Sequence, residues 1–243
     1  MKLVVFDVDN NLAPLNRAMP ETVARRVRAL QERATVALAS GKPCANLAGF
    51  ARGAGLEVHK LPLIGENGCD VWLSAALPPS GTLEGAADFI SPDVLAELAR
   101  ARDAFADAYR GRIFFQPNRV AVTPFPLDLE TLAPGELARF AIGLGLKGTT
   151  LFRHSDCIDL VPAGIDKGVA VRALAAWLGV GMSEVASIGD GDNDVPMLEV
   201  TDLSIWVGRN EMAMAAAKHQ RDTIEAALDL LEGWLSQAGS AAV

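Results

Sequence analysis

Short, continuously apolar segments alternate with helices near both ends of this 243-residue chain, and this alternation restricts the fold more than any other feature. Such segments are typical of strands that are buried on both faces of a parallel sheet. We predict strands at 3–6, 35–40, near Val58, 61–65, 185–189 and 203–208, and helices at 20–34, 43–51 and 166–178. The two ends of the chain therefore predict one α/β domain, a Rossmann-like parallel sheet covered by helices.

The middle of the chain follows a different order. The dipeptide Asn67-Gly68 predicts a tight hairpin turn, and "PPSG" at 78–81 has the composition of a linker. Beyond it we predict a helix at 91–109, strands at 112–116 and 119–125, a helix at 134–144, and strands at 149–153 and 157–161. This αββαββ order predicts an antiparallel sheet with helices on one face. We therefore expect an inserted α+β domain at 79–160 between two parts of the α/β domain, 1–78 and 161–243.

Composition narrows the classes of function. A net charge of -8 disfavours polyanionic partners, so we expect neither nucleic acid nor an anionic membrane to be the main partner. No apolar stretch approaches the roughly 20 residues of a membrane-spanning helix, which favours a cytoplasmic protein. Three widely spaced cysteines indicate neither a disulfide framework nor a zinc site. The sequence leaves the oligomeric state open.

Polar residues stand where three of the predicted parallel strands end. Asp7 and Asp9 follow the first strand, Ser40-Gly41 follows the second, and Asp190 opens "DGDND" after the strand 185–189. Because the carboxyl ends of strands in an open parallel sheet meet at one edge and bind ligands there, we expect these side chains to converge. Asp7 and Asp9, two residues apart on an extended segment, would face the same way.

Crowded carboxylates repel one another, so a cluster of Asp7, Asp190 and Asp194 needs a positive counter-charge to remain ionised. An all-oxygen set of ligands suits Mg²⁺, which takes one or two carboxylates and keeps other positions for water and phosphate oxygens. Lys167, in the first turn of a predicted helix, is disfavoured by the helix dipole unless an anion lies nearby. A phosphate group would supply that anion, and Ser40 with the following backbone N–H groups forms a second anion-binding corner.

This set of residues predicts phosphoryl-transfer chemistry. Asp7 could attack phosphorus and form an aspartyl-phosphate, while Mg²⁺ and Lys167 neutralise the developing charge. Asp9 would protonate the leaving oxygen and later activate water.

The four segments "DVDNNL", "ALASGK", "IDKG" and "IGDGDND" resemble, in order and spacing, the four motifs of the haloacid dehalogenase-like phosphohydrolases. The insert resembles the subclass IIB cap, and "DVDNNL", "GENG" and "GDGDNDVPM" are most similar to archaeal-type phosphoglycolate phosphatases. The first motif is commonly Asp-x-Asp-Gly-Thr, whereas this chain has Asn10 and Asn11 in place of Gly and Thr. Asparagine tolerates the left-handed backbone that glycine favours, so we expect the turn at Asn10 to be kept.

The resemblance implies a role for each matching residue. Asp7 would be the nucleophile, and Asp9 the acid/base that also offers its backbone carbonyl to Mg²⁺. Asp190 and Asp194 would complete the metal site, while Ser40 and Lys167 would hold the phosphate. We also assign Gly41, Asn193 and Arg119 to phosphate or substrate binding. In the insert, Asn118, Arg119, His154 and Asp156 lie near predicted turns and are candidates for contact with the leaving group.

One glycine-rich segment matches a nucleotide-binding pattern but lies in the wrong place for that function. "GLGLKG" at 143–148 matches GxGxxG but follows a predicted helix, which is the reverse of a dinucleotide-binding fold. We expect a magnesium-dependent phosphatase whose partner is a small phosphate monoester, with phosphoglycolate or a sugar phosphate favoured. A phosphosugar mutase with the same chemistry and a non-catalytic metabolite-binding protein are the alternatives.

Overall fold

A seven-stranded sheet organises one part of the chain, in the order β11-β10-β9-β1-β2-β3-β4. The computed structural model describes residues 1–76, 90–208 and 215–237. The strands are β1 (Leu3–Asp7), β2 (Thr35–Ala39), β3 (Leu63–Gly65), β4 (Asp70–Trp72), β9 (Val185–Gly189), β10 (Leu203–Val207) and β11 (His219–Arg221). All neighbours pair in parallel except β3 and β4, which form the hairpin predicted at Asn67-Gly68.

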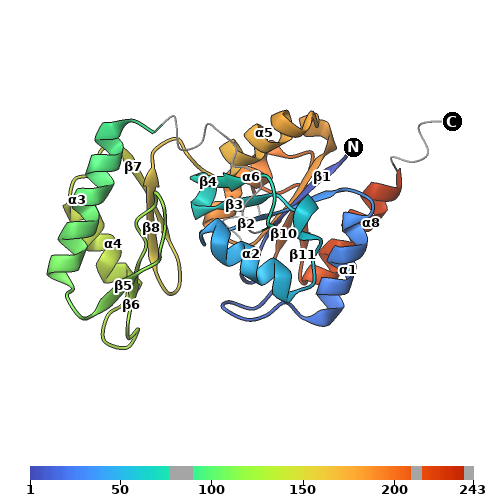
Figure 1. The fold of residues 1–243 in the computed structure, drawn as a ribbon. Coiled ribbons are helices and arrows are strands. Elements are labelled where there is room, and N and C mark those ends of the chain that lie inside the picture. The colour runs from blue at the N-terminus through green and yellow to red at the C-terminus, as the bar shows by residue number, and fades with distance from the viewer. Residues whose placement is uncertain (77–89, 209–214, 238–243) are drawn as a thin grey trace.

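Helices cover both faces of this sheet (Figure 1). They are α1 (Glu21–Gln31), α2 (Cys44–Gly53), α5 (Lys167–Leu178), α6 (Val195–Val200) and α8 (Ile224–Gln237). Successive residues of β1 point to opposite faces: Val4 and Phe6 pack with residues of α1, α2 and α8, whereas Leu3 and Val5 pack with α5 and α6. Burial on both faces explains why these strands are continuously apolar and confirms the predicted α/β class.

The inserted part, called the cap below, lies beside the carboxyl end of the sheet (Figure 1). It contains α3 (Pro92–Ala108), β5 (Ile113–Phe115), β6 (Pro124–Pro126), α4 (Pro134–Gly143), β7 (Thr149–Arg153) and β8 (Ile158–Pro162), which is the predicted αββαββ order. Ser91 caps α3 by accepting the Val94 N–H. The pairs β5–β6 and β7–β8 are antiparallel, and a single bridge from Val122 to Leu160 joins them.

Two local predictions were wrong, and one strand was missed. The segment at Val58–Lys60 is a 3-10 turn rather than a strand, because the Glu57 carboxylate accepts the His59 N–H. The strand expected at 119–125 is only Pro124–Pro126, since the N–H groups of 119–121 bond to Glu66 instead of to a neighbouring strand. The edge strand β11 was not predicted. The proposed linker at 78–81 and the boundary at 78/79 lie outside the described residues. Across the described ranges, no helix is both long and apolar enough to cross a membrane.

Candidate active site

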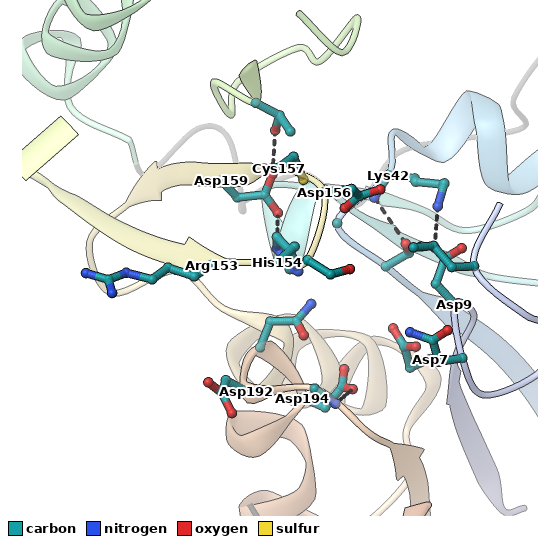
Figure 2. A pocket seen from close by; sticks show the side chains of 18 of the residues that line it. Asp7, Asp9, Lys42, Arg153, His154, Asp156, Cys157, Asp159, Asp192 and Asp194 are labelled. Atoms are coloured by element: carbon teal, nitrogen blue, oxygen red, sulfur yellow. Dashed lines mark hydrogen bonds and ion pairs between the residues drawn. The ribbon is translucent and has the colours of Figure 1, made fainter. Parts of the chain in front are cut away.

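A cavity of about 410 Å³ lies where the carboxyl ends of β1, β2 and β9 face the β7–β8 turn of the cap (Figure 2). Most of the predicted site residues line it: Asp7, Asp9, Ser40, Gly41, Asp190, Asn193 and Asp194 from the sheet, and His154 and Asp156 from the cap. Lys167 contributes from beneath, because it is fully buried against two of these aspartates. The sheet edge therefore brings together residues from four distant segments of the sequence.

Lys167 is the centre of the cavity floor. Its Nζ lies 2.6 Å from Asp7 Oδ1 and 2.5 Å from Asp194 Oδ1. The lysine occupies the first position of α5, after Asp166, whose carboxylate caps the helix by accepting the Val169 N–H. A cation at a helix N-terminus needs an anionic partner, and here two carboxylates supply it without any phosphate. Burial would lower the pKa of Lys167, but Asp194 and Asp7 outweigh it and raise the pKa.

The floor carries more negative than positive charge. Asp7, Asp190 and Asp194 offer oxygens that all lie within 4.8 Å of one another. Three carboxylates against one lysine leave two negative charges without compensation. Burial first, and then repulsion between the carboxylates, raises the pKa of Asp7 to about 7 and that of Asp190 to about 8. A divalent cation would match this deficit, so the residues present fit Mg²⁺.

The carboxylates differ in how many partners they already have. Asp194 Oδ2 accepts the N–H groups of Asp190 and Gly191, each at 2.9 Å, while its Oδ1 binds Lys167. Asn11 Nδ2 donates to Asp190 Oδ1 at 2.6 Å and to Asp7 Oδ2 at 3.3 Å. Asn11 Oδ1 is buried and has no hydrogen-bond partner among the described residues. Asp7 and Asp190 thus keep more free acceptor capacity for a cation than Asp194, which belongs to the same cluster and also orders the loop around it.

Asp9 lies at the rim of the floor. It forms an ion pair with Lys42, and its Oδ1 accepts the Asn16 N–H at 3.2 Å. Asn10 has a φ of 60°, which confirms the predicted left-handed turn and directs Asp9 into the cavity. Ser40 Oγ accepts the Lys42 N–H at 3.1 Å, so the same residue orders both Ser40 and Asp9.

The cap side of the cavity is built around Asp159. This buried carboxylate accepts hydrogen bonds from Thr123 Oγ1 at 2.6 Å and Asn67 Nδ2 at 2.6 Å, and pairs with His154 Nε2 at 2.9 Å. Burial would lower the pKa of His154, but its hydrogen bond and charge interaction with Asp159 raise it. The cap wall is therefore a hydrogen-bonded network in which the carboxylate has several donors.

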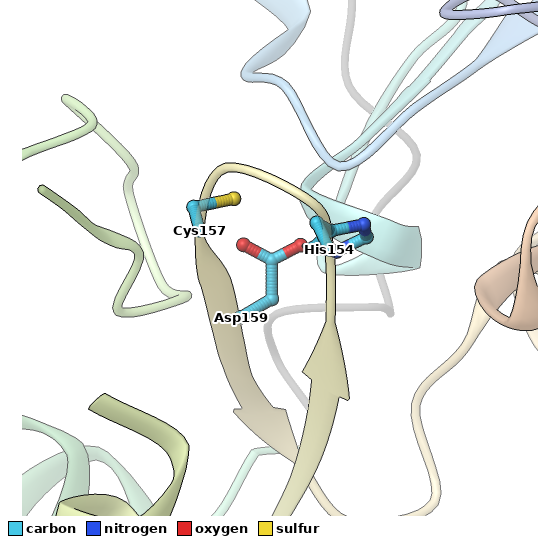
Figure 3. A group of neighbouring side chains, drawn as sticks. All are labelled: His154, Cys157 and Asp159. Carbon is cyan, nitrogen blue, oxygen red and sulfur yellow. Dashed lines mark hydrogen bonds and ion pairs between the residues drawn. The ribbon is translucent and has the colours of Figure 1, made fainter. Parts of the chain in front are cut away.

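His154, Cys157 and Asp159 also form a compact group of metal-ligand types (Figure 3). Two observations argue against a metal there. Both oxygens of Asp159 are already engaged, and burial together with the neighbouring Asp159 and Asp156 raises the pKa of the Cys157 thiol. A thiol must lose its proton to bind a metal, so the group serves better as a hydrogen-bonding cluster.

Arg119 lies apart from the cavity lining. Its Nη1 pairs with Asp70 Oδ1 at 2.7 Å, and its backbone N–H donates to Glu66 Oε1 at 2.7 Å. Asn118 also lies outside the lining and donates to Thr123 Oγ1. The structure thus places Arg119 at the junction of cap and sheet, and its role in substrate binding stays a prediction.

Several residues of the site were not found by sequence reasoning, among them Asn11, Lys42, Asn67 and Asp159. The sequence marks Asn11 only as a departure from a motif, and Asn67 only as a turn residue. Lys42 follows Ser40-Gly41 directly, so its position next to the anion-binding corner was a usable signal. The sequence gives no comparable signal for Asp159, because this residue lies inside a strand and its neighbours depend on how that strand pairs.

Comparison with known proteins agrees with this geometry. The family profile of haloacid dehalogenase-like hydrolases matches residues 138–226. The fold matches a structure described as a HAD subclass IIB sugar phosphatase, with a TM-score of 0.70 at 18% identity over 96% of this chain and 99% of that one. A haloacid dehalogenase-like hydrolase from Bacteroides thetaiotaomicron gives a TM-score of 0.73 at 19% identity, over 95% of this chain and 99% of that one. At these identities the structural matches establish the fold alone. The chain is therefore similar to haloacid dehalogenase-like hydrolases in its profile match, over 138–226, and in its fold.

Two relatives align over most of their length. The phosphoglycolate phosphatase of Methanoculleus marisnigri is 27% identical over 85% of this chain and 84% of its own. The phosphoglycolate phosphatase of Pyrobaculum islandicum is 29% identical over 89% of this chain and 87% of its own. By contrast, the chain spans only 10% of the length of the chloroplastic endoribonuclease YBEY of Arabidopsis thaliana, with 38% identity over 61 residues.

Proposed function

We propose that the chain is a magnesium-dependent phosphomonoesterase that acts on a small phosphorylated metabolite. The observation that carries this proposal is the cavity floor, where Lys167 contacts Asp7 and Asp194 and Asp190 completes a cluster with a deficit of positive charge. Asp7, Asp190 and Asp194 would hold Mg²⁺, together with the backbone carbonyl of Asp9. Bound there, the ion would neutralise charge on the phosphoryl oxygens and keep the carboxylates ionised.

The residues of the chain then have distinct tasks. An Asp7 oxygen attacks phosphorus, the new O–P bond gives an aspartyl-phosphate, and the bond to the leaving oxygen breaks. Asp9 donates a proton to that oxygen and later takes one from the water that hydrolyses the intermediate, which restores Asp7. Ser40 and Lys167 hold the phosphoryl group. Lys42, through its ion pair, keeps Asp9 directed at the cavity.

The cavity wall presents both neutral and cationic groups to a leaving group. Gln116, Thr123 and Ser155 line it with neutral hydrogen-bonding side chains. Two of its cationic side chains, Lys42 and His154, already pair with Asp9 and Asp159. A carboxylate on the leaving group, as in phosphoglycolate, would compete with those pairs. Arg153 also lines the cavity and could bind such a carboxylate, so a sugar or polyol phosphate and phosphoglycolate, the substrate in the names of the two long relatives, are both candidates.

The test is release of inorganic phosphate from a panel of phosphoglycolate, several sugar phosphates and p-nitrophenyl phosphate. We expect release that requires Mg²⁺, stops on addition of a chelator and disappears in Asp7→Asn. Product analysis by phosphorus NMR separates a phosphatase from a mutase, since a mutase gives an isomer without net phosphate. Failure of every compound to turn over would contradict the proposal and favour a metabolite-binding role.

A further inference from the structure

Glu66 and Asn67 form an unusual turn between β3 and β4. Both residues are fully buried, and both have left-handed backbones, with φ values of 53° and 54°. Residues other than glycine rarely adopt this conformation, and it persists where the surroundings fix it. Here the surroundings belong to the cap, because the Glu66 carboxylate accepts the N–H groups of 119–121 and the Asn67 amide donates to Asp159.

Asn67 touches three parts of the site at once. Its Nδ2 donates to Asp159 of the cap at 2.6 Å, and its Oδ1 accepts from Asn193 Nδ2 at 2.9 Å. Its backbone N–H donates to the carbonyl of Ser40 at 3.1 Å. Asn193 belongs to the turn Asp192–Asp194, which contains Asp194 and follows Asp190 of the carboxylate cluster, and Ser40 begins the anion-binding corner. One buried asparagine therefore links the cap wall to both loops of the floor, through its side-chain amide and its backbone N–H.

Close packing around this amide depends on Gly41. A Cβ atom at Gly41 would lie 2.8 Å from Asp159 Oδ2 and 3.3 Å from Asn67 Nδ2, so no larger residue fits while the cap is closed. The Gly41 carbonyl also accepts a hydrogen bond from Gln116 Nε2 of the cap at 3.0 Å. The cap thus binds the anion-binding corner directly as well as through Asn67.

We propose that Asn67 is a positioning residue that couples closure of the cap to the arrangement of the phosphate-binding and metal-binding loops. The proposal rests on the phosphatase function proposed above. An amide suits this place because it can donate to a carboxylate on one side and accept from Asn193 on the other. When Asp159 leaves with an opening cap, the amide loses the partner that fixes its orientation, and Asn193 loses a fixed acceptor. Catalytic geometry is then complete only with the cap closed over the substrate.

Exchanging the two partners tests this coupling. Asn67→Asp places a carboxylate against Asp159, and Asp159→Asn removes the charge that the amide binds. We expect each single variant to lower kcat/KM for the best substrate by about tenfold or more, mainly through kcat. The double variant N67D/D159N restores one donor and one acceptor across the boundary, and aspartate tolerates the left-handed backbone. We expect it to recover to within about threefold of the parent.

A distance measurement reports closure independently of turnover. Spin labels at Arg25→Cys on α1 and Asp103→Cys on α3 sit on exposed positions at opposite ends of the molecule (Figure 1), and the native cysteines are buried. Double electron–electron resonance should show a longer or broader distribution of spin–spin distances in each single variant. The double variant should show the parental distribution. Glu97→Gln is the matched control, since it neutralises a cap carboxylate that bonds only within the cap and should change neither readout.

The outcomes separate the two proposals. Single variants that keep the parental distance and turnover, or a double variant no better than the poorer single one, would overturn the coupling. If no variant releases phosphate, the parent included, the proposed function fails, while the distance distributions still decide whether Asn67 and Asp159 hold the cap closed.

Discussion

The floor and the cap wall of the cavity both bury carboxylates, but they differ in how far the protein itself compensates the charge. On the floor, three carboxylates share one lysine, and burial with mutual repulsion raises the pKa of Asp7 and of Asp190. On the cap wall, one carboxylate, Asp159, has three side-chain partners of its own. The floor is therefore incomplete until a cation arrives, whereas the cap wall is satisfied by the protein itself.

The contrast between floor and cap wall shows which groups are held at a cost in stability for the sake of function. Groups that must bind a cation and a phosphate are held in an arrangement that is unfavourable without them. Groups that close the site are held by ordinary hydrogen bonds, which can form and break as the cap moves. Neutralising a floor carboxylate should therefore stabilise the magnesium-free protein, whereas removing a group with a partner, such as Lys167 on the floor or a cap-wall residue, should destabilise it.

The largest effect is expected for Asp7→Asn. Loss of the nucleophile should lower phosphate release by more than about 10⁴-fold. The same change should raise the thermal stability of the magnesium-free protein, because it removes a buried carboxylate whose pKa is raised by burial and by Asp194. Activity assays and thermal unfolding with and without Mg²⁺ measure both. The exposed Asp103→Asn serves as control, and a magnesium-free Asp7→Asn protein less stable than the parent would contradict the account of the floor.

Lys167→Met should have the opposite effect on stability. It leaves Asp7 and Asp194 buried without their cation, and breaking a buried ion pair in this way costs about 3–5 kcal/mol. Urea unfolding measures the loss, and added Mg²⁺ should recover part of it by supplying positive charge. Lys147→Met, at an exposed position, is the matched control and should change little. A loss no larger than that of the control would mean that the floor is not held by charge.

The sequence predicted the floor well and the cap wall poorly, for a physical reason. Asp7, Ser40 and Asp190 follow strands that are neighbours in a parallel sheet, so topology alone brings their side chains together. Asp159 and Asn67 meet only because the cap lies against the sheet, and that orientation has no local signal. The predicted cap order was right, but its strand at 119–125 was too long because Glu66 takes its N–H groups.

Glu66→Gln probes the junction between the two sides. The carboxylate is buried, which raises its pKa despite three backbone N–H donors from the cap. Glutamine keeps one acceptor oxygen and turns an NH₂ group toward a donor, so we expect a loss of about 1.5–3 kcal/mol in the free energy of unfolding. Glu97→Gln controls for loss of a charge elsewhere in the cap. Unchanged stability would show that the cap does not depend on this contact.

The smallest effect is a pH dependence confined to the cap wall. Asp159 raises the pKa of His154 above its ordinary value of about 6.5. A raised histidine pKa in the folded state contributes stability that is fully present below the unfolded value and is lost as the pH rises through the folded one. The stability difference between the parent and His154→Gln should therefore be larger at pH 6 than at pH 9. Urea unfolding of both proteins at the two pH values cancels the titration of groups that do not interact with His154, while the smaller effects of Lys167 and Asp156 on this histidine remain in the difference. A difference independent of pH would mean that His154 bonds to Asp159 as a neutral ring, and the cap wall would then contain no ion pair to weaken as the pH rises.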